Sequence, residues 1–314
     1  MSETRTPTRR RLLALGAAAA LFAPALVRAA KRPELRAGDQ KGNLHALLDA
    51  AGELKDLDYD IRWTEFPAAA PLAEALNAEA VDIGPIGDAP LIFAVAQGVR
   101  IRAFAASKSD PYGTAIIVKP DSGITGGAQL KGRSIATNRG SIGHYVALRT
   151  LAAAGLKPTD AQFRFLAPPE AKLALVSGAV DAWATWEPYT AVAETMDGLK
   201  VIASGRGLWS GLGYTAATET ALRDKRDILV DFRSRVARAQ QWGIQHPDEY
   251  AATLSRIIGI PLQAARLSAS RRRTHDVKID ASVVAEQQRS ADFYLDSGLL
   301  TKRLDVAATS FATI

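Results

Sequence analysis

The pattern of apolar and polar positions divides the chain near residue 219. Before it, short apolar runs alternate with amphipathic stretches, which is typical of an α/β fold whose parallel strands are joined by helices. The pattern predicts strands at 34–38, 59–66, 81–86, 101–105 and 114–118, and helices at 43–54, 71–78 and 89–97. After residue 219 the pattern is helical, with a long helix over 224–246 that ends at Pro247 and shorter helices over 248–258 and 280–297.

A weak internal repeat appears when the chain is shifted by 99 residues. The shift places Asp82 on Asp181, Asp88 on Glu187 and His45 on His144. Since one offset aligns strand, turn and helix start twice, we expect two similarly built lobes. The first would comprise 31–118 and 213–314, and the second 119–212. The chain would cross between them near 116–118 and 213–215.

Three predicted strand-to-helix turns, at 38–43, 84–90 and 138–144, carry small and polar residues. Ligands of open parallel sheets bind at the carboxyl ends of strands, and the free N–H groups of a helix start favour an anion. Gly87 and Gly140 would allow close approach of the backbone, while Asp88 and Ser141 suit helix N-caps. The alternative is that each turn is an ordinary connection of an α/β protein.

No motif for metal, nucleotide or nucleophilic chemistry accompanies these turns. The phosphate-binding glycine motifs do not occur at a strand-to-helix turn, and the four histidines lack metal-ligand spacing. Ser141 has no nucleophile-elbow frame, and His144 is better interpreted as a packing residue than as a base. We therefore predict neither a cofactor nor a metal.

The segment 180–189 supplies the aromatic candidates. Trp183 and Trp186 would face opposite sides of a strand because their separation is odd. We predict that Trp186, next to Glu187, forms a ligand wall and that Trp183 is core, with the reverse assignment as the alternative. The run 271–273 of three arginines is interpreted as a solvated face rather than a phosphate site.

The first thirty residues have the pattern of an export signal. Three consecutive arginines at 9–11 precede an uncharged stretch over 12–27, which is too short to span a bilayer as a helix. Small residues around position 29 suit a cleavage site. We predict a signal peptide over 1–30, of Tat-like or Sec type, and a mature protein in the periplasm; an uncleaved membrane anchor is the alternative.

Composition and charge exclude several classes of protein. The chain is 47% hydrophobic and 23% charged and has no Cys, which argues against disorder, a disulfide scaffold or a thiol enzyme. Its net charge of +6 belongs largely to the leader, because the residues beyond 30 hold 34 basic and 32 acidic side chains, or +2. No nucleic-acid partner is therefore expected.

Taken together, these motifs resemble those of the periplasmic aliphatic-sulfonate-binding proteins of ABC importers, within the nitrate/sulfonate/taurine-binding family. The most specific stretches are 40–44, 74–77, 81–90, 121–124, 130–132, 138–141, 166–168 and 180–189. The resemblance implies an α/β, two-lobed periplasmic binding protein fold of type II, with two hinge strands and a helical C-terminal region, that closes on its ligand.

The resemblance also implies which residues line the cleft. Carried over by position, these are Gln40, Gly87, Asp88, Ala89, Ser141, Ile142, Trp186 and Glu187. We add His144, from the third turn, and Tyr214, from the second crossover. Family members commonly have Thr in place of Ala89 and Asn in place of Ile142. The loss of both polar side chains favours a larger or more apolar ligand, such as an aryl sulfonate or a sulfate ester.

The implied function is that of a monomeric, non-catalytic receptor. It would capture an organic sulfonate or related sulfur-containing anion and deliver it to an ABC permease in the inner membrane. The alternatives are a binding protein for another organic anion, a sensor module, or an enzyme on the same fold. The desulfinases of this fold use a Cys nucleophile, which this chain lacks.

Overall fold

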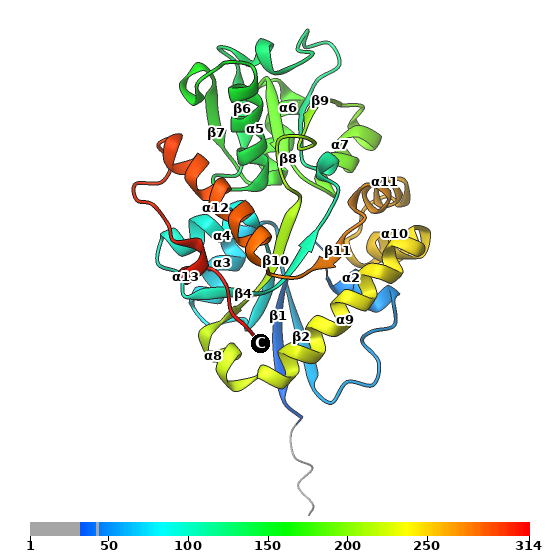
Figure 1. Cartoon of the computed structure of the whole chain (residues 1–314). Helices are drawn as coiled ribbons and strands as arrows, with labels where there is room; N and C mark the ends of the chain where they lie inside the picture. The colour runs from blue at the N-terminus through cyan, green and yellow to red at the C-terminus, as the bar shows by residue number, and fades with distance from the viewer. Residues whose placement is uncertain (1–31, 42–43) are drawn as a thin grey trace, which may run out of the picture. The chain divides into compact units, whose positions relative to one another are not determined.

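The computed structural model describes residues 32–41 and 44–314, and residues 34–314 form one compact unit (Figure 1). The predicted signal peptide over 1–30 lies outside the described residues. Within the described part of the chain, no helix has both the length and the apolar character needed to cross a membrane.

Eleven strands form two sheets among these residues. In chain order they are β1 (Glu34–Gln40), β2 (Asp60–Phe66), β3 (Ile83–Gly87), β4 (Ile101–Lys108), β5 (Ala115–Val118), β6 (Ser134–Thr137), β7 (Gln162–Phe165), β8 (Ala182–Thr185), β9 (Lys200–Ser204), β10 (Leu212–Thr218) and β11 (His275–Val277). The first sheet has the order β11-β4-β10-β3-β1-β2, and the second has the order β7-β6-β8-β5-β9.

Helices connect these strands and continue through the C-terminal third. They are α2 (His45–Ala50), α3 (Ala69–Asn77), α4 (Asp88–Ala96), α5 (Ile142–Ala153), α6 (Pro168–Ser177), α7 (Tyr189–Asp197), α8 (Glu219–Asp224), α9 (Arg226–Gln245), α10 (Pro247–Ile258), α11 (Leu262–Arg272), α12 (Ala281–Asp296) and α13 (Val306–Thr309). The helix expected over 43–54 is the shorter α2, and α11 falls in a stretch for which no helix was predicted.

The two sheets are built alike, and the 99-residue offset relates them. α6 begins 99 residues after α3, β8 99 residues after β3, and β9 99 residues after β4. In each sheet one strand lies between the equivalent pair and runs antiparallel to both: β10 between β3 and β4, and β5 between β8 and β9. The repeat in the sequence therefore marks two units of the same topology.

The expectation of parallel strands is wrong for β5 and β10, which pair antiparallel with their neighbours. The antiparallel β11 falls in the C-terminal part, for which only helices were expected. An apolar run indicates burial but not direction, so the sequence pattern could not distinguish them. β5 also pairs inside the second sheet, and the chain therefore changes sheets within residues 109–114. The boundary expected after residue 118 would assign β5 to the first lobe.

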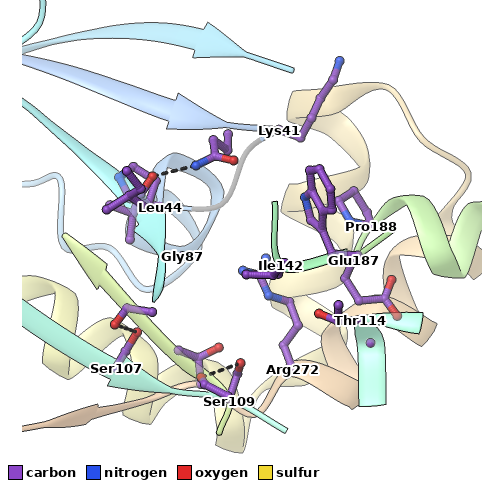
Figure 2. A pocket seen from close by; sticks show the side chains of 18 of the residues that line it. Lys41, Leu44, Gly87, Ser107, Ser109, Thr114, Ile142, Glu187, Pro188 and Arg272 are labelled. Atoms are coloured by element: carbon purple, nitrogen blue, oxygen red, sulfur yellow. Dashed lines mark hydrogen bonds between the residues drawn. The ribbon is translucent and has the colours of Figure 1, made fainter. Parts of the chain in front are cut away.

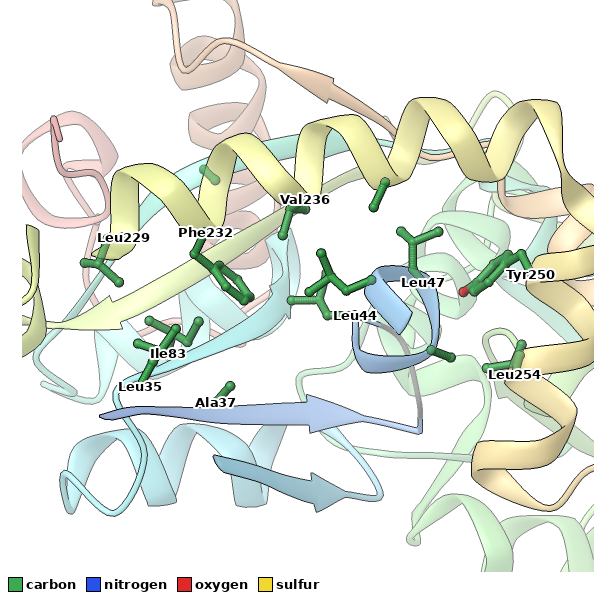
Figure 3. Packing of buried hydrophobic residues seen from close by; sticks show 14 of the residues in the cluster. Leu35, Ala37, Leu44, Leu47, Ile83, Leu229, Phe232, Val236, Tyr250 and Leu254 are labelled. Carbon is green, nitrogen blue, oxygen red and sulfur yellow. The ribbon is translucent and has the colours of Figure 1, made fainter. Parts of the chain in front are cut away.

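Helices cover both faces of the first sheet. On one face, Leu35 and Ile83 belong to a cluster with residues of α2, α9 and α10, and they lie beside Phe232 of α9 (Figure 3). Leu72 of α3 and Leu91 of α4 pack on the other face. The buried positions of α9 recur every three or four residues, as expected for an amphipathic helix against a sheet. Because helices cover both faces of the sheet, a ligand can approach it at the ends of the strands.

Candidate functional site

A cleft of about 180 Å³ lies where the turns of the two sheets face one another (Figure 2). From the first sheet it receives Gln40 at the end of β1 and Gly87 at the end of β3. From the second it receives Ser141 and Ile142 at the start of α5, and Trp186 after β8. Gly87 faces Ile142 so closely that a Cβ there would lie 2.8 Å from Cγ2 of Ile142.

The structure brings seven of the ten candidate residues to this cleft: Gln40, Gly87, Ser141, Ile142, Trp186, Glu187 and Tyr214. The Tyr214 side chain is nevertheless buried, with its hydroxyl donating to Gln287 and its ring against Phe311. Asp88, Ala89 and His144 are buried outside the cleft wall. The Ala89 side chain packs in a cluster with Tyr145 and Tyr294.

Carboxylates occupy two of the three helix starts. Asp39 accepts hydrogen bonds from the backbone N–H groups of Leu44 and His45 at α2, and Asp88 Oδ1 accepts one from Ala89 N–H at 2.7 Å. At α5 the cap is neutral, because Ser141 Oγ accepts from His144 N–H at 3.1 Å. The positive end of α5 is therefore the one best suited to a ligand anion.

Burial perturbs both capping carboxyls. It raises the pKa of Asp39 to about 6, helped by repulsion from Glu65, although three backbone N–H groups oppose the shift. It raises the pKa of Asp88 to about 7, against a hydrogen bond from Trp209 Nε1 at 2.8 Å. Each folded-state pKa lies above the ordinary value of 3.8. The folded state therefore favours the protonated forms.

The perturbed Asp88 predicts an unusual pH dependence of stability. The contribution of protonated Asp88 to the free energy of unfolding is fully present below about pH 4 and is lost as pH rises through about 7. The protein should therefore be less stable at pH 8 than at pH 5. Asp88→Asn imitates the protonated form and should reduce that difference by on the order of 1–3 kcal/mol. Urea unfolding at the two pH values measures it.

Asp181→Asn is the control, because the pKa of Asp181 is lowered and its charge does not change in that window. Burial would raise this pKa, but hydrogen bonds from Ser134 and the charge of Arg133 outweigh it. An Asp88→Asn variant with the full wild-type pH dependence would contradict the prediction.

His144 is a packing residue. Its ring packs edge-on against both Phe163 and Phe165, with centroids 5.0 and 5.2 Å away, and Gly140 N–H donates to its Nδ1 at 3.3 Å. Burial and the charge of Arg139 lower its pKa to about 4. His144 is therefore neutral near pH 7.

The two tryptophans of β8 and of the turn after it lie in different surroundings. Trp183 is 1% exposed within the core between β8, α6 and α7, whereas Trp186 lines the cleft. Protein donors engage both oxygens of the Glu187 carboxyl: its Oε2 accepts from Ala191 N–H at 3.1 Å, and its Oε1 accepts from Arg271 at 3.3 Å. Burial raises the Glu187 pKa, and these two partners oppose it.

The interpretation of residues 271–273 as a solvated face is wrong for the two arginines at the end of α11. Arg271 pairs with Glu187 and Glu194, and its side chain is only 15% exposed. Arg272 lines the cleft and reaches into it toward the start of α5 (Figure 2). Its guanidinium also shares a hydrogen bond with the Tyr250 side chain.

Sequence reasoning missed Arg272 because it missed the helix that carries it. The buried positions of α11 are small residues, Ala264, Ala265, Ser268 and Ala269, which give little hydrophobic signal. Their spacing of three and four residues was the one available indication. No group of side chains suited to a metal ion occurs among residues 32–41 and 44–314.

This arrangement, two like sheets with a ligand cleft between their turns, defines the class of two-lobed binding proteins. A family model described as "ABC transporter, phosphonate, periplasmic substrate-binding protein" matches residues 55–233. The chain belongs to this family of periplasmic substrate-binding proteins of ABC transporters.

Solved structures and a curated relative support the assignment. The alkanesulfonate-binding protein SsuA from Xanthomonas axonopodis pv. citri, bound to MOPS, is 31% identical, with a TM-score of 0.81 over 90% of this chain and 99% of that one. The periplasmic aliphatic sulphonate binding protein SsuA from Escherichia coli is also 31% identical, with a TM-score of 0.77 over 90% and 92%. The taurine-binding periplasmic protein of Escherichia coli (strain K12) is 28% identical, over 66% of this chain and 67% of that one.

Proposed function

We propose that this protein captures an organic sulfonate in the cleft and presents it to an ABC permease. The observation that carries the proposal is the convergence of the Arg272 side chain and the neutrally capped start of α5 on one cavity. A guanidinium and a helix start both donate hydrogen bonds to oxyanions. Trp186, on the same wall, would pack against the organic part of the ligand.

The charges around the cleft favour a monoanion. A sulfonate carries one negative charge, whereas a phosphate-like group carries about −1.5 to −2 near neutral pH. Lys41, Arg272 and Arg273 line the cleft together with Asp110 and Glu187, so three basic and two acidic side chains leave a formal balance of +1. This balance matches one negative charge on the ligand better than two, so sulfonates should be preferred to phosphonates.

The geometry supports binding without catalysis. Ser141 Oγ serves as the α5 cap, and the nearby His144 is a neutral packing residue whose Nδ1 faces Gly140 N–H. An activated serine needs a base aligned with its hydroxyl, and His144 does not have that role here. We further propose that the mature protein is a periplasmic monomer, exported by the signal over 1–30, whose lobes close around the ligand.

Isothermal titration of the exported protein with sulfonates, phosphonates and carboxylates of equal organic groups tests the function. We expect sulfonates to bind at least about tenfold more tightly than the matching phosphonates, and no conversion of the bound ligand by mass spectrometry. Small-angle scattering should show a smaller radius with ligand. A preference for phosphonates, or the absence of sulfonate binding, would overturn the proposal.

Arg272→Gln should weaken sulfonate binding by about 1.5–3 kcal/mol, or roughly tenfold to a hundredfold, because a charge-assisted hydrogen bond is lost. Arg266→Gln is the matched control: it makes the same change on α11, but its side chain is 59% exposed and pairs with Asp248. Equal affinities of the two variants in titration would remove Arg272 from the binding site.

A further inference from the structure

A second tryptophan reaches the cleft from the segment that joins the two sheets. Residues 205–211 connect β9 of the second sheet with β10 of the first, and Trp209 in this segment lines the same cavity as Trp186. The Trp209 side chain is half-buried. Part of it packs against the cluster that contains Tyr145 and Tyr294, and the part that borders the cavity is open to a ligand.

Contacts with the protein hold the Trp209 indole in place. Its Nε1 donates to Asp88 Oδ2 at 2.8 Å, and its backbone N–H donates to the carbonyl oxygen of Gly205 at 2.8 Å. A Cβ at Gly205 would lie 3.4 Å from Cε3 of the indole, so the ring packs closely against this glycine. An aromatic surface that is fixed before the ligand arrives loses little conformational freedom on binding.

The hydrogen bond from Trp209 gives Asp88 a role that its burial otherwise denies it. Asp88 is 1% exposed and lies outside the cleft wall, so it does not touch a ligand directly. It holds an indole that does border the cleft. Trp186 follows β8 of the second sheet, whereas the Trp209 indole is anchored at the start of α4. Aromatic surface therefore reaches the cavity from two separate parts of the fold.

We propose that Trp209 is a specificity-determining residue of the cleft, that Asp88 is its positioning residue, and that the preferred ligands are sulfonates whose organic part is an aromatic ring. The proposal rests on the proposed function and names its substrate class. Arg272 and the start of α5 would hold the anion, and the two indoles would contact the ring.

The chemistry of the two indoles favours an aromatic over a saturated ring. Pairs of aromatic rings attract each other through their quadrupoles, in addition to the apolar area that they bury. A sulfonate group withdraws electrons from the ring that carries it, and the electron-rich indole is a favourable partner for such a ring. A saturated ring with the same number of carbons buries a similar area and lacks the quadrupole. Aromaticity, rather than size, should therefore separate the two ligands.

The test compares benzenesulfonate with cyclohexanesulfonate by isothermal titration of the exported protein. The wild type should bind benzenesulfonate about five- to tenfold more tightly, because each indole can pair with its ring. Trp209→Leu should lower this ratio at least about twofold, whereas Trp209→Phe should keep most of it. Both variants lose the hydrogen bond to Asp88, so they differ in the aromatic ring alone. Trp242→Leu, outside the cleft where the indole stacks on His246, should keep the wild-type ratio.

Asp88→Leu tests the positioning role. It removes the acceptor for the Trp209 indole and should lower the ratio of the two affinities as Trp209→Leu does. In a Trp209→Leu background the same change should leave the ratio unaltered, because Asp88 acts on the ligand through the indole. Loss of the α4 cap by itself would lower the melting temperature in both backgrounds without changing the ratio. A ratio that falls equally in both backgrounds would show that Asp88 does not position Trp209.

The remaining outcomes separate this specificity from the function itself. An unchanged ratio in Trp209→Leu, or equal losses in Trp209→Leu and Trp209→Phe, would overturn the role of Trp209. A wild type that binds both sulfonates equally would overturn the preference for aromatic rings, whether or not Trp209→Leu folds, and would leave the proposed function standing. Binding of no sulfonate would overturn both.

Discussion

Replacing Asp82 with Ala should lower the free energy of unfolding by about 3 kcal/mol, although Asp82 lies just before β3 and outside the cleft. Its side chain is 3% exposed and accepts from Arg36 Nη2 at 2.5 Å and from Lys225 Nζ at 2.6 Å. Removing one member of a buried ion network leaves the others uncompensated, which costs about 3–5 kcal/mol. We take the lower end because Arg36 and Lys225 remain about a quarter exposed.

The repeat in the fold supplies a control at the equivalent position. Asp181 lies 99 residues later and bonds to Ser134 and Arg133, but its side chain is 35% exposed. Asp181→Ala should therefore cost only about 1 kcal/mol. Urea unfolding of the two variants compares them directly. An equal loss at both positions would show that burial does not determine the strength of this aspartate network.

The loss of unfolding free energy in Asp82→Ala should also depend on pH. Burial alone would raise the pKa of Asp82, but the hydrogen bonds from Arg36 and Lys225 hold it below 3.8. A carboxyl with a depressed pKa contributes stability above its unfolded pKa and loses it as pH falls through the folded one. The difference between wild type and variant should thus be constant near neutral pH and shrink below about pH 4.

Much of the fold followed from the sequence because hydrophobic period and turn chemistry act locally. The strands ending at Phe66 and Val118 and the helices α9, α10 and α12 lie close to their expected bounds. Strand direction depends on long-range pairing, so the antiparallel placement of β5 and β10 was not predictable from period alone. The helix α11 was not predicted because alanines and a serine, rather than large apolar residues, form its buried face.

The candidate site was predictable where it depends on turns and not where it depends on side chains meeting across the fold. Ser141, Ile142 and Trp186 follow directly after strands, and the structure places them on one cavity. Arg272 reaches that cavity from the C-terminal third. Nothing local in the sequence distinguishes Arg272 from Arg271, which pairs with two glutamates. Their difference arises from the side chains that α7 and α10 place beside the end of α11.

The two halves of the cleft have equivalent frameworks and different charges. The first-sheet turns carry Asp39 and Asp88, whose carboxyls occupy the N–H groups of α2 and α4. In the second sheet, Ser141 supplies a neutral cap to α5, whereas Glu187, the counterpart of Asp88, accepts from Ala191 N–H at the start of α7. Among these four helix starts, the capping residue thus leaves α5 as the one without a protein carboxyl and able to receive an anion.

The two tryptophans should respond to the same substitution in opposite ways. Trp183→Ala should lower the free energy of unfolding by about 3–5 kcal/mol, because the side chain is 1% exposed between β8, α6 and α7. Trp186→Ala should leave the melting temperature nearly unchanged, since Trp186 borders the cleft and contacts Tyr189 with ring centroids 6.0 Å apart.

For binding, Trp186→Ala should weaken affinity by at least about tenfold, and the loss should grow with the apolar area of the ligand because burial scales with area. Titration of each variant with a short and a long alkanesulfonate, together with thermal unfolding, measures both effects. Each tryptophan serves as the other's control, since the substitution is the same and only the environment differs. If Trp186→Ala unfolds the protein, or if short and long ligands lose affinity equally, Trp186 does not form the wall that contacts the organic part of the ligand.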